Sequence, residues 1–141
     1  MASTTAFTNR AKYDFLIGTH LSNANYRIAL YTDTATNNSA TTQYSATNEV
    51  ANGNGYTTAG QTLSTYSCTI DTGVAYIDWS TDPSWPTSTI SAHSCLIYNN
   101  TDTNKGAIGV WDFGATISSS NGTFTVTFPA PAGATGLIRI T

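Results

Sequence analysis

Charged side chains are scarce in this sequence: Lys, Arg, Asp and Glu together make up only 9% of its 141 residues, and the formal net charge is −3. Proteins that hold a nucleic-acid backbone concentrate positive charge on one surface, because each phosphate contact needs a cation. The composition therefore disfavours nucleic-acid binding. Solubility must come from neutral polar side chains, above all Thr, Ser and Asn.

Long apolar runs are also missing. No segment approaches the roughly 18 to 20 consecutive apolar residues that cross a membrane, so no membrane partner is expected. The first residues, Met1–Thr5, contain neither a positive cluster nor an apolar stretch, and no secretory signal is predicted. We therefore expect a protein that is made in the cytoplasm.

Cysteine is rare, with Cys68 and Cys95 the only two in the chain. Both lie in alternating apolar runs on different expected strands, which favours two buried thiols. The alternative is a disulfide that forms after cell lysis, if the two strands are neighbours. Neither a Cys-x-x-Cys pair nor a nearby second histidine accompanies them, so no metal site is predicted.

The residues that are abundant favour β-structure. Thr and aromatic side chains suit a pleated, half-exposed surface, whereas Lys, Glu and Arg, the usual surface residues of helices, are almost absent. A length of 141 residues predicts one domain with one core, spanning residues 1–141. The predicted fold is an all-β, single-domain antiparallel β-sandwich, or a jelly-roll or barrel, of about eight short strands.

Segments with alternating apolar side chains, or bounded by turn residues, predict the strands. They are Asn25–Thr32, Leu63–Ile70, Val74–Trp79, Thr89–Tyr98, Ala107–Phe113, Thr116–Ile117, Gly122–Phe128 and Leu137–Thr141. Two prolines exclude a central strand at 80–88. Trp85 in that segment is expected to close one end of the core, and the alternative is a surface on which a sugar ring stacks.

One short N-terminal helix is predicted over residues 8–19, where the apolar spacing becomes helical. Ala11, Phe15 and, less regularly, Leu16 lie on one side, and Gly18 is the expected stop. We expect this helix to cover one end of the β core. The alternative is an arm that docks on a neighbouring subunit.

The densest turn chemistry of the chain lies in Glu49–Leu63. Gly53, Gly55 and Gly60 surround Tyr56 in this segment. Glycine at this density marks backbone that turns sharply or adopts positive φ, where a Cβ atom is not tolerated. We therefore predict a structured turn with Tyr56 packed beneath it and the tyrosine hydroxyl free to bond a backbone group of the loop.

A long polar loop followed by this glycine-rich turn is predicted over residues 34–62. Long ordered loops are where binding usually takes place, so the loop is the first surface expected to contact a partner. The residues selected as a partner interface are Tyr44, Tyr56, Trp85 and Phe15.

No set of residues in the sequence predicts catalysis or cofactor binding. His93 precedes Cys95 by two residues, which would place both on one face of a strand, but no third group is evident to orient the histidine. Asp71, Asp78 and Asp82 would bind calcium only if their loops met, and ordinary turn carboxylates are favoured. We therefore expect a protein that is not an enzyme and needs no cofactor or metal.

The glycine-rich turn resembles a motif in a family of small virion proteins of tailed double-stranded-DNA bacteriophages. Members carry an acidic residue, a Gly-x-Gly-Tyr turn and a Gly-Gly-x-x-Leu close. The matching residues here are Glu49, Val50, Gly53, Gly55, Tyr56, Gly60 and Leu63, followed in order by Trp79 or Trp85, by Cys95–Tyr98 and by Asp112–Gly114. Ala59 departs from the pattern, because the family usually has a second glycine there, and this affects the local turn geometry.

The resemblance implies a non-enzymatic structural protein located in the virion. A capsid decoration or cement protein is favoured, with the major capsid protein as partner and a homo-oligomer as its state, a trimer first and a dimer second. One alternative is a tail-tip or fibre-associated module that binds host carbohydrate through Trp79, Trp85 and Tyr44. Another is a head–tail connector or tail-completion protein.

Overall fold

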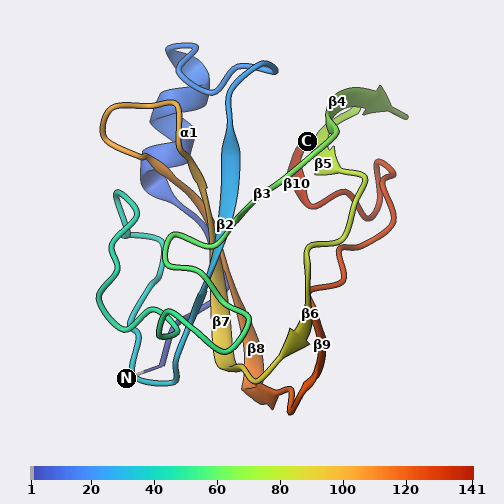
Figure 1. Cartoon of the computed structure of the whole chain (residues 1–141). Coiled ribbons are helices and arrows are strands. Elements are labelled where there is room, and N and C mark those ends of the chain that lie inside the picture. The colour runs from blue at the N-terminus through green and yellow to red at the C-terminus, as the bar shows by residue number, and fades with distance from the viewer. Residues whose placement is uncertain (1) are drawn as a thin grey trace.

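The structure, a computed structural model, describes residues 2–141. In chain order the elements are β1 (Ala6–Phe7), α1 (Asn9–Leu16), β2 (Tyr26–Tyr31), β3 (Gln61–Thr62), β4 (Tyr66–Asp71), β5 (Val74–Trp79), β6 (Ser84–Ser88), β7 (Ser91–Asn99), β8 (Ala107–Ser118), β9 (Gly122–Thr125) and β10 (Ile138–Ile140) (Figure 1). The all-β prediction with one short N-terminal helix is confirmed. Within residues 2–141, no helix has the length and apolar character needed to cross a membrane.

Three antiparallel sheets form a sandwich-like arrangement. The largest has the strand order β1-β8-β7-β2-β3, and the smaller sheets have the orders β10-β5-β4 and β6-β9. Both smaller sheets pack against one face of the large sheet, since a single apolar cluster joins Ile28 of β2 and Ile97 of β7 to Trp79 of β5, Phe124 of β9 and Ile138 of β10. This cluster is the main core of the protein.

The opposite face of the large sheet is also buried. The chain between β2 and β3, residues 32–60 and hereafter the 32–60 loop, lies over it on the side away from β5 and β9 (Figure 1). A second apolar cluster contains Tyr31, Leu96 and Tyr98 of the sheet, with Tyr44 of the loop packed against it. The central strands β2 and β7 are consequently buried on both faces, as in the middle layer of a three-layer structure.

Helix α1 is shorter than the predicted 8–19 segment. The side chain of Thr8 caps it by accepting a hydrogen bond from Ala11 N at 3.0 Å, and Gly18, with φ +77°, lies just beyond its end. Ala11 packs in the core as predicted. Leu16 was wrongly placed on the packed side, because it is 89% exposed, and Asp14 takes a buried position instead.

The prediction of two buried thiols is correct for Cys95 and wrong for Cys68. Both cysteines are free, but Cys68 lies on the exposed part of β4. The 80–88 segment, which contains two prolines, forms the strand β6. This strand pairs only with β9, so it is not a central strand and no hydrogen bonds to a second neighbouring strand are required of it. Trp85 on β6 is 5% exposed and packs beside Phe124, as expected for a side chain that closes the core.

Candidate functional site

The 32–60 loop replaces a neighbouring strand along much of β2. Strand β3 pairs with β2 only at Arg27 and Ile28. Farther along, Leu30 N donates to the Tyr56 hydroxyl and Leu30 O accepts from Val50 N, each at 2.9 Å. Because its hydrogen bonds satisfy an otherwise free sheet edge, the loop is fixed in position although it has almost no regular secondary structure.

Glu49 is the centre of this loop. One carboxylate oxygen accepts from the Tyr44 hydroxyl at 2.6 Å, and the other accepts from the Tyr56 hydroxyl at 2.6 Å and from Ala59 N at 2.8 Å. Burial, and then the bond to Glu49, raise the pKa of Tyr56 far above its usual value, so the phenol stays a donor. The only glutamate of the chain therefore joins three separate points of the loop.

Glycine is required in the turn for two physical reasons. Gly53, Gly55 and Gly60 have φ values of +113°, +88° and +69°, a region that L side chains rarely adopt. In addition, a Cβ atom on Gly60 would lie 1.7 Å from the carbonyl oxygen of Ile28, and one on Gly55 would lie 2.8 Å from Ser88 Cβ. The turn can approach the sheet this closely only without side chains.

Ala59 shows why glycine suits its position. Its φ is +74°, so alanine is held in a left-handed conformation that costs free energy. Its carbonyl accepts from Arg27 Nε at 3.0 Å and from the Tyr98 hydroxyl at 2.8 Å, while its N–H bonds to Glu49. These three bonds hold Ala59 in this conformation.

The four residues selected as an interface fall into two groups. Tyr56 and Trp85 are 2% and 5% exposed, so they support the fold and present no surface to a partner, which corrects that part of the interface hypothesis. Tyr44 is half-buried, with its ring stacked on Tyr98 at 4.6 Å between centroids. Phe15 is half-buried beside the His20 ring at 4.8 Å.

A group of exposed apolar side chains lies close to Phe15 in the sequence. It occupies the end of α1 and the turns that follow, and each member is more than half exposed: Tyr13, Leu16, Ile17 and Leu21. Such groups on a protein surface commonly mark a contact with another molecule. The helical spacing did not identify this surface, because it assigned Leu16 to the packed side.

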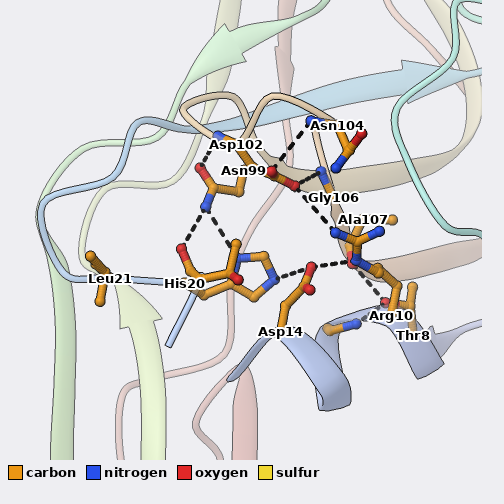
Figure 2. A network of polar contacts seen from close by, with 12 residues as sticks. Thr8, Arg10, Asp14, His20, Leu21, Asn99, Asp102, Asn104, Gly106 and Ala107 are labelled. Carbon is orange, nitrogen blue, oxygen red and sulfur yellow. Dashed lines mark hydrogen bonds and ion pairs between the residues drawn. The ribbon is translucent and has the colours of Figure 1, made fainter. Parts of the chain in front are cut away.

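A buried polar network joins α1 to the loop between β7 and β8 (Figure 2). Arg10 Nε donates to Asp14 Oδ2 at 2.6 Å, and Arg10 also reaches Asp102 at 3.7 Å. Asn99 Nδ2 lies 3.1 Å from His20 Nδ1, and His20 Nε2 faces Asp14 Oδ2 at 3.6 Å. The network joins distant segments of the chain and so supports the fold, although Asp14 Oδ1 and His20 Nε2 have no hydrogen-bond partner within it.

Burial decides the charge state of His20. Desolvation lowers the pKa of its imidazole, and the neighbouring Asp14 carboxylate only partly opposes that effect. A neutral ring with Nδ1 accepting from Asn99 carries its proton on Nε2, on the side of Asp14. The carbonyl of Thr19, just before this histidine, accepts from Asn99 Nδ2 at 3.3 Å and not from the imidazole.

His93 has the third group that sequence reasoning did not find. Its Nε2 lies 3.3 Å from Asp112 Oδ1, and its Nδ1 lies 3.3 Å from Thr116 Oγ1. The pairing with β8 shifts here, from Ala92 opposite Ile117 to Ser94 opposite Asp112, which leaves residues 113–116 as a bulge opposite the histidine. The ring therefore bridges the two ends of that bulge.

This histidine arrangement does not form a substrate site with Cys95. Burial raises the pKa of the Cys95 thiol to about 12, so the thiol stays protonated and is a poor nucleophile. A groove of about 370 Å³ beside Cys95 is lined mainly by apolar and aromatic side chains, and neither His93 nor Thr116 lines it. A second groove of about 380 Å³ shares Trp111 and Leu137 with the first as lining residues.

The aspartates considered for calcium bind backbone instead. Asp71, Asp78 and Asp82 accept from the N–H groups of Gly133, Trp79 and Phe128. Among residues 2–141, no three metal-ligating side chains come together as a candidate metal site.

Comparisons with protein-family models, with curated proteins and with solved structures found no match. A proposal for the function therefore depends on the residues themselves, on their geometry and on the motif that resembles phage virion proteins.

Proposed function

We propose that this chain is a non-enzymatic structural protein of a tailed-phage particle, and that it binds the major capsid protein as a decoration or cement protein. The observation that carries the proposal is the 32–60 loop. Its backbone is hydrogen-bonded to β2, and three of its residues, Tyr44, Tyr56 and Ala59, donate hydrogen bonds to the Glu49 carboxylate. Most of its polar residues are nevertheless exposed. A surface that is ordered before binding loses little conformational entropy when a partner covers it.

The chemistry of this surface suits many weak contacts. Thr, Ser, Asn and Ala dominate residues 32–52, and the segment has few charges, so each contact would consist of neutral hydrogen bonds and small apolar areas. One such site binds weakly. Repetition around a symmetric shell raises the total affinity through multivalency, which is how a small protein stabilises a lattice.

Two of the three aromatic residues considered for carbohydrate binding are not accessible to a sugar. Trp79 and Trp85 are buried in the core, and only Tyr44 keeps a partly exposed ring. Stacking on a sugar needs an open ring face. One face of Tyr44 already packs on Tyr98, and Lys105 Nζ lies 5.6 Å from the centroid of its ring.

The test is rebinding of purified chain to phage heads that lack it. Ala46 and Ala51 are exposed on the 32–60 loop, and Ala115 is exposed on the β8 bulge. We expect Ala46→Arg and Ala51→Arg to reduce the number of copies bound per head, and Ala115→Arg, the matched control, to bind like the original chain. Equal binding by all three variants would rule out the loop as the contact surface, and no binding of the original chain would contradict the capsid proposal.

A further inference from the structure

Strand β4 forms the outer edge of the β10-β5-β4 sheet, and it pairs with β5 alone (Figure 1). The two-residue turn Thr72-Gly73 joins the two strands, and all six residues of β4 have a partner in β5 without a register shift. A six-residue edge in regular geometry can accept another strand. It is the longest strand of the smaller sheets that has a neighbour on one side only.

The hydrogen bonds of this edge can be assigned residue by residue. Asp71 and Val74 flank the turn as a hydrogen-bonded pair, so the alternation directs the N–H and C=O of Ser67 and Thr69 toward β5. Those of the other three strand residues point outward: Tyr66, Cys68 and Ile70. No backbone hydrogen bond to these three residues from another part of the described chain satisfies them.

Two features that normally protect an edge strand, a positively charged residue and a proline, are absent from β4. Its sequence, Tyr-Ser-Cys-Thr-Ile-Asp, contains no lysine, arginine or proline, and Ile70 is 76% exposed. Three other edges differ from β4. The 32–60 loop covers the edge of β2 beyond β3, β6 carries a proline and a register shift, and β10 has three residues, one of them Arg139.

We propose that β4 binds β4 of a second copy of this chain, in antiparallel orientation about a twofold axis at Cys68. In this register Cys68 lies opposite Cys68 of the second copy, and Tyr66 lies opposite Ile70. All three outward residues then form hydrogen-bonded pairs, two bonds each, and the two small sheets become one six-stranded sheet. A register centred on Thr69 leaves one outward residue of each copy unpaired.

The side chains fit the same register. Cross-strand pairing places Tyr66, Cys68 and Ile70 on the face that carries Trp79, Ile77 and Ala75. Tyr66 of one copy then covers the exposed Ile70 of the other, and aromatic pairs with β-branched residues are favourable across strands. The contact is twofold and self-complementary, so it produces a dimer, and it depends on backbone geometry and not on the proposed virion function.

The first test measures self-association by sedimentation of the full chain over a dilution series. Ile70→Lys places a charge on the edge, whereas Leu16→Lys, the matched control, replaces another highly exposed apolar side chain, on α1. We expect a wild-type dimer, at least about tenfold weaker association for Ile70→Lys, and no change for Leu16→Lys. A monomeric wild-type chain, or weakening by Leu16→Lys alone, would overturn the proposal.

The second test reads the register. In the proposed dimer the two Cys68 Cα atoms lie about 5.5 Å apart, within the range of a disulfide, so an added oxidant converts two thiols to one interchain disulfide. Cys68→Ser combined with Ser64→Cys moves the thiol to another exposed residue, which lies beyond the Tyr66 end of β4, where the two copies of Tyr66 are already about 14 Å apart. Rapid cross-linking of the natural chain and slow cross-linking of this control support the register, and equal rates would contradict it.

Discussion

Replacement of the partly exposed Glu49 should destabilise the protein strongly. Glu49→Ala removes the acceptor for the hydroxyls of Tyr44 and Tyr56 and for Ala59 N. A hydrogen bond to a charged group contributes about 1.5 to 3 kcal/mol, less where water competes. Since Tyr56 is buried and Tyr44 is half-exposed, we expect the free energy of unfolding to fall by about 3 to 5 kcal/mol.

Glu49→Gln removes the charge of the side chain but keeps its size and shape. One amide oxygen can still accept from Tyr56 and Ala59, whereas the NH₂ group cannot accept from Tyr44. The expected loss is therefore smaller, about 1 to 2 kcal/mol. Asp33→Asn is the control, because Asp33 is exposed, and we expect a change below about 0.5 kcal/mol.

Urea denaturation followed by circular dichroism measures these changes through the midpoint, with the slope unchanged. In the Glu49→Ala background, Tyr44→Phe should cost almost nothing further, since its partner is already gone. If Glu49→Ala lowered stability by less than about 1 kcal/mol, the loop would not be held by this carboxylate.

Three further predictions concern stability. Gly60→Ala should cost more than about 3 kcal/mol in urea denaturation because its Cβ would meet the Ile28 carbonyl, whereas Gly53→Ala, with open space around it, should cost about 1. Burial lowers the pKa of His20, so the unfolded chain binds the proton more readily: stability measured by thermal denaturation should fall as pH decreases below about 6.5, and less so in His20→Asn. Burial raises the pKa of Tyr26 and Tyr31, so stability should decrease above pH ~10, and the part of the tyrosinate absorbance that is lost in Tyr26→Phe and Tyr31→Phe should appear only on unfolding; ionisation of either residue without unfolding would contradict this.

Local signals in the sequence predicted much of the fold. The Asp71-Thr72-Gly73 turn between two alternating segments identified the β4–β5 hairpin, and the structure gives Thr72 and Gly73 the positive φ values of a tight hairpin turn. The spacing of apolar residues identified the position of α1, and Gly18 marked its end. The glycines around Tyr56 predicted backbone with positive φ.

Other features depend on contacts between distant segments, which a local pattern does not contain. Asp14 is buried because Arg10 and the loop after β7 surround it, whereas the helical spacing alone does not place it on the packed side. Cys68 follows the alternation of a core strand, but its end of the hairpin extends beyond the core. The sequence did contain a signal that β2 is buried on both faces. Ala29-Leu30-Tyr31 is continuously apolar, whereas a strand with only one buried face would alternate apolar and polar residues.

The hydrogen-bonding role of Glu49 was also not predicted, because the sequence motif showed only an acidic residue before a glycine-rich turn. Its three donors come from the loop itself, 5, 7 and 10 residues away, and only the folded turn brings them to one carboxylate. The His93 bridge has the same origin, since the extra residues of the β8 bulge appear only when the strands are paired.

The proposed capsid role is tested most directly by the location of the chain in phage particles that contain it. Such particles would be broken gently, heads and tails separated on a density gradient, and the copies of this chain counted in each fraction by quantitative peptide mass spectrometry. The account predicts many copies with the heads, in a fixed ratio to the major capsid protein. A few copies confined to the tails would contradict the decoration role and favour a function in host recognition or tail assembly.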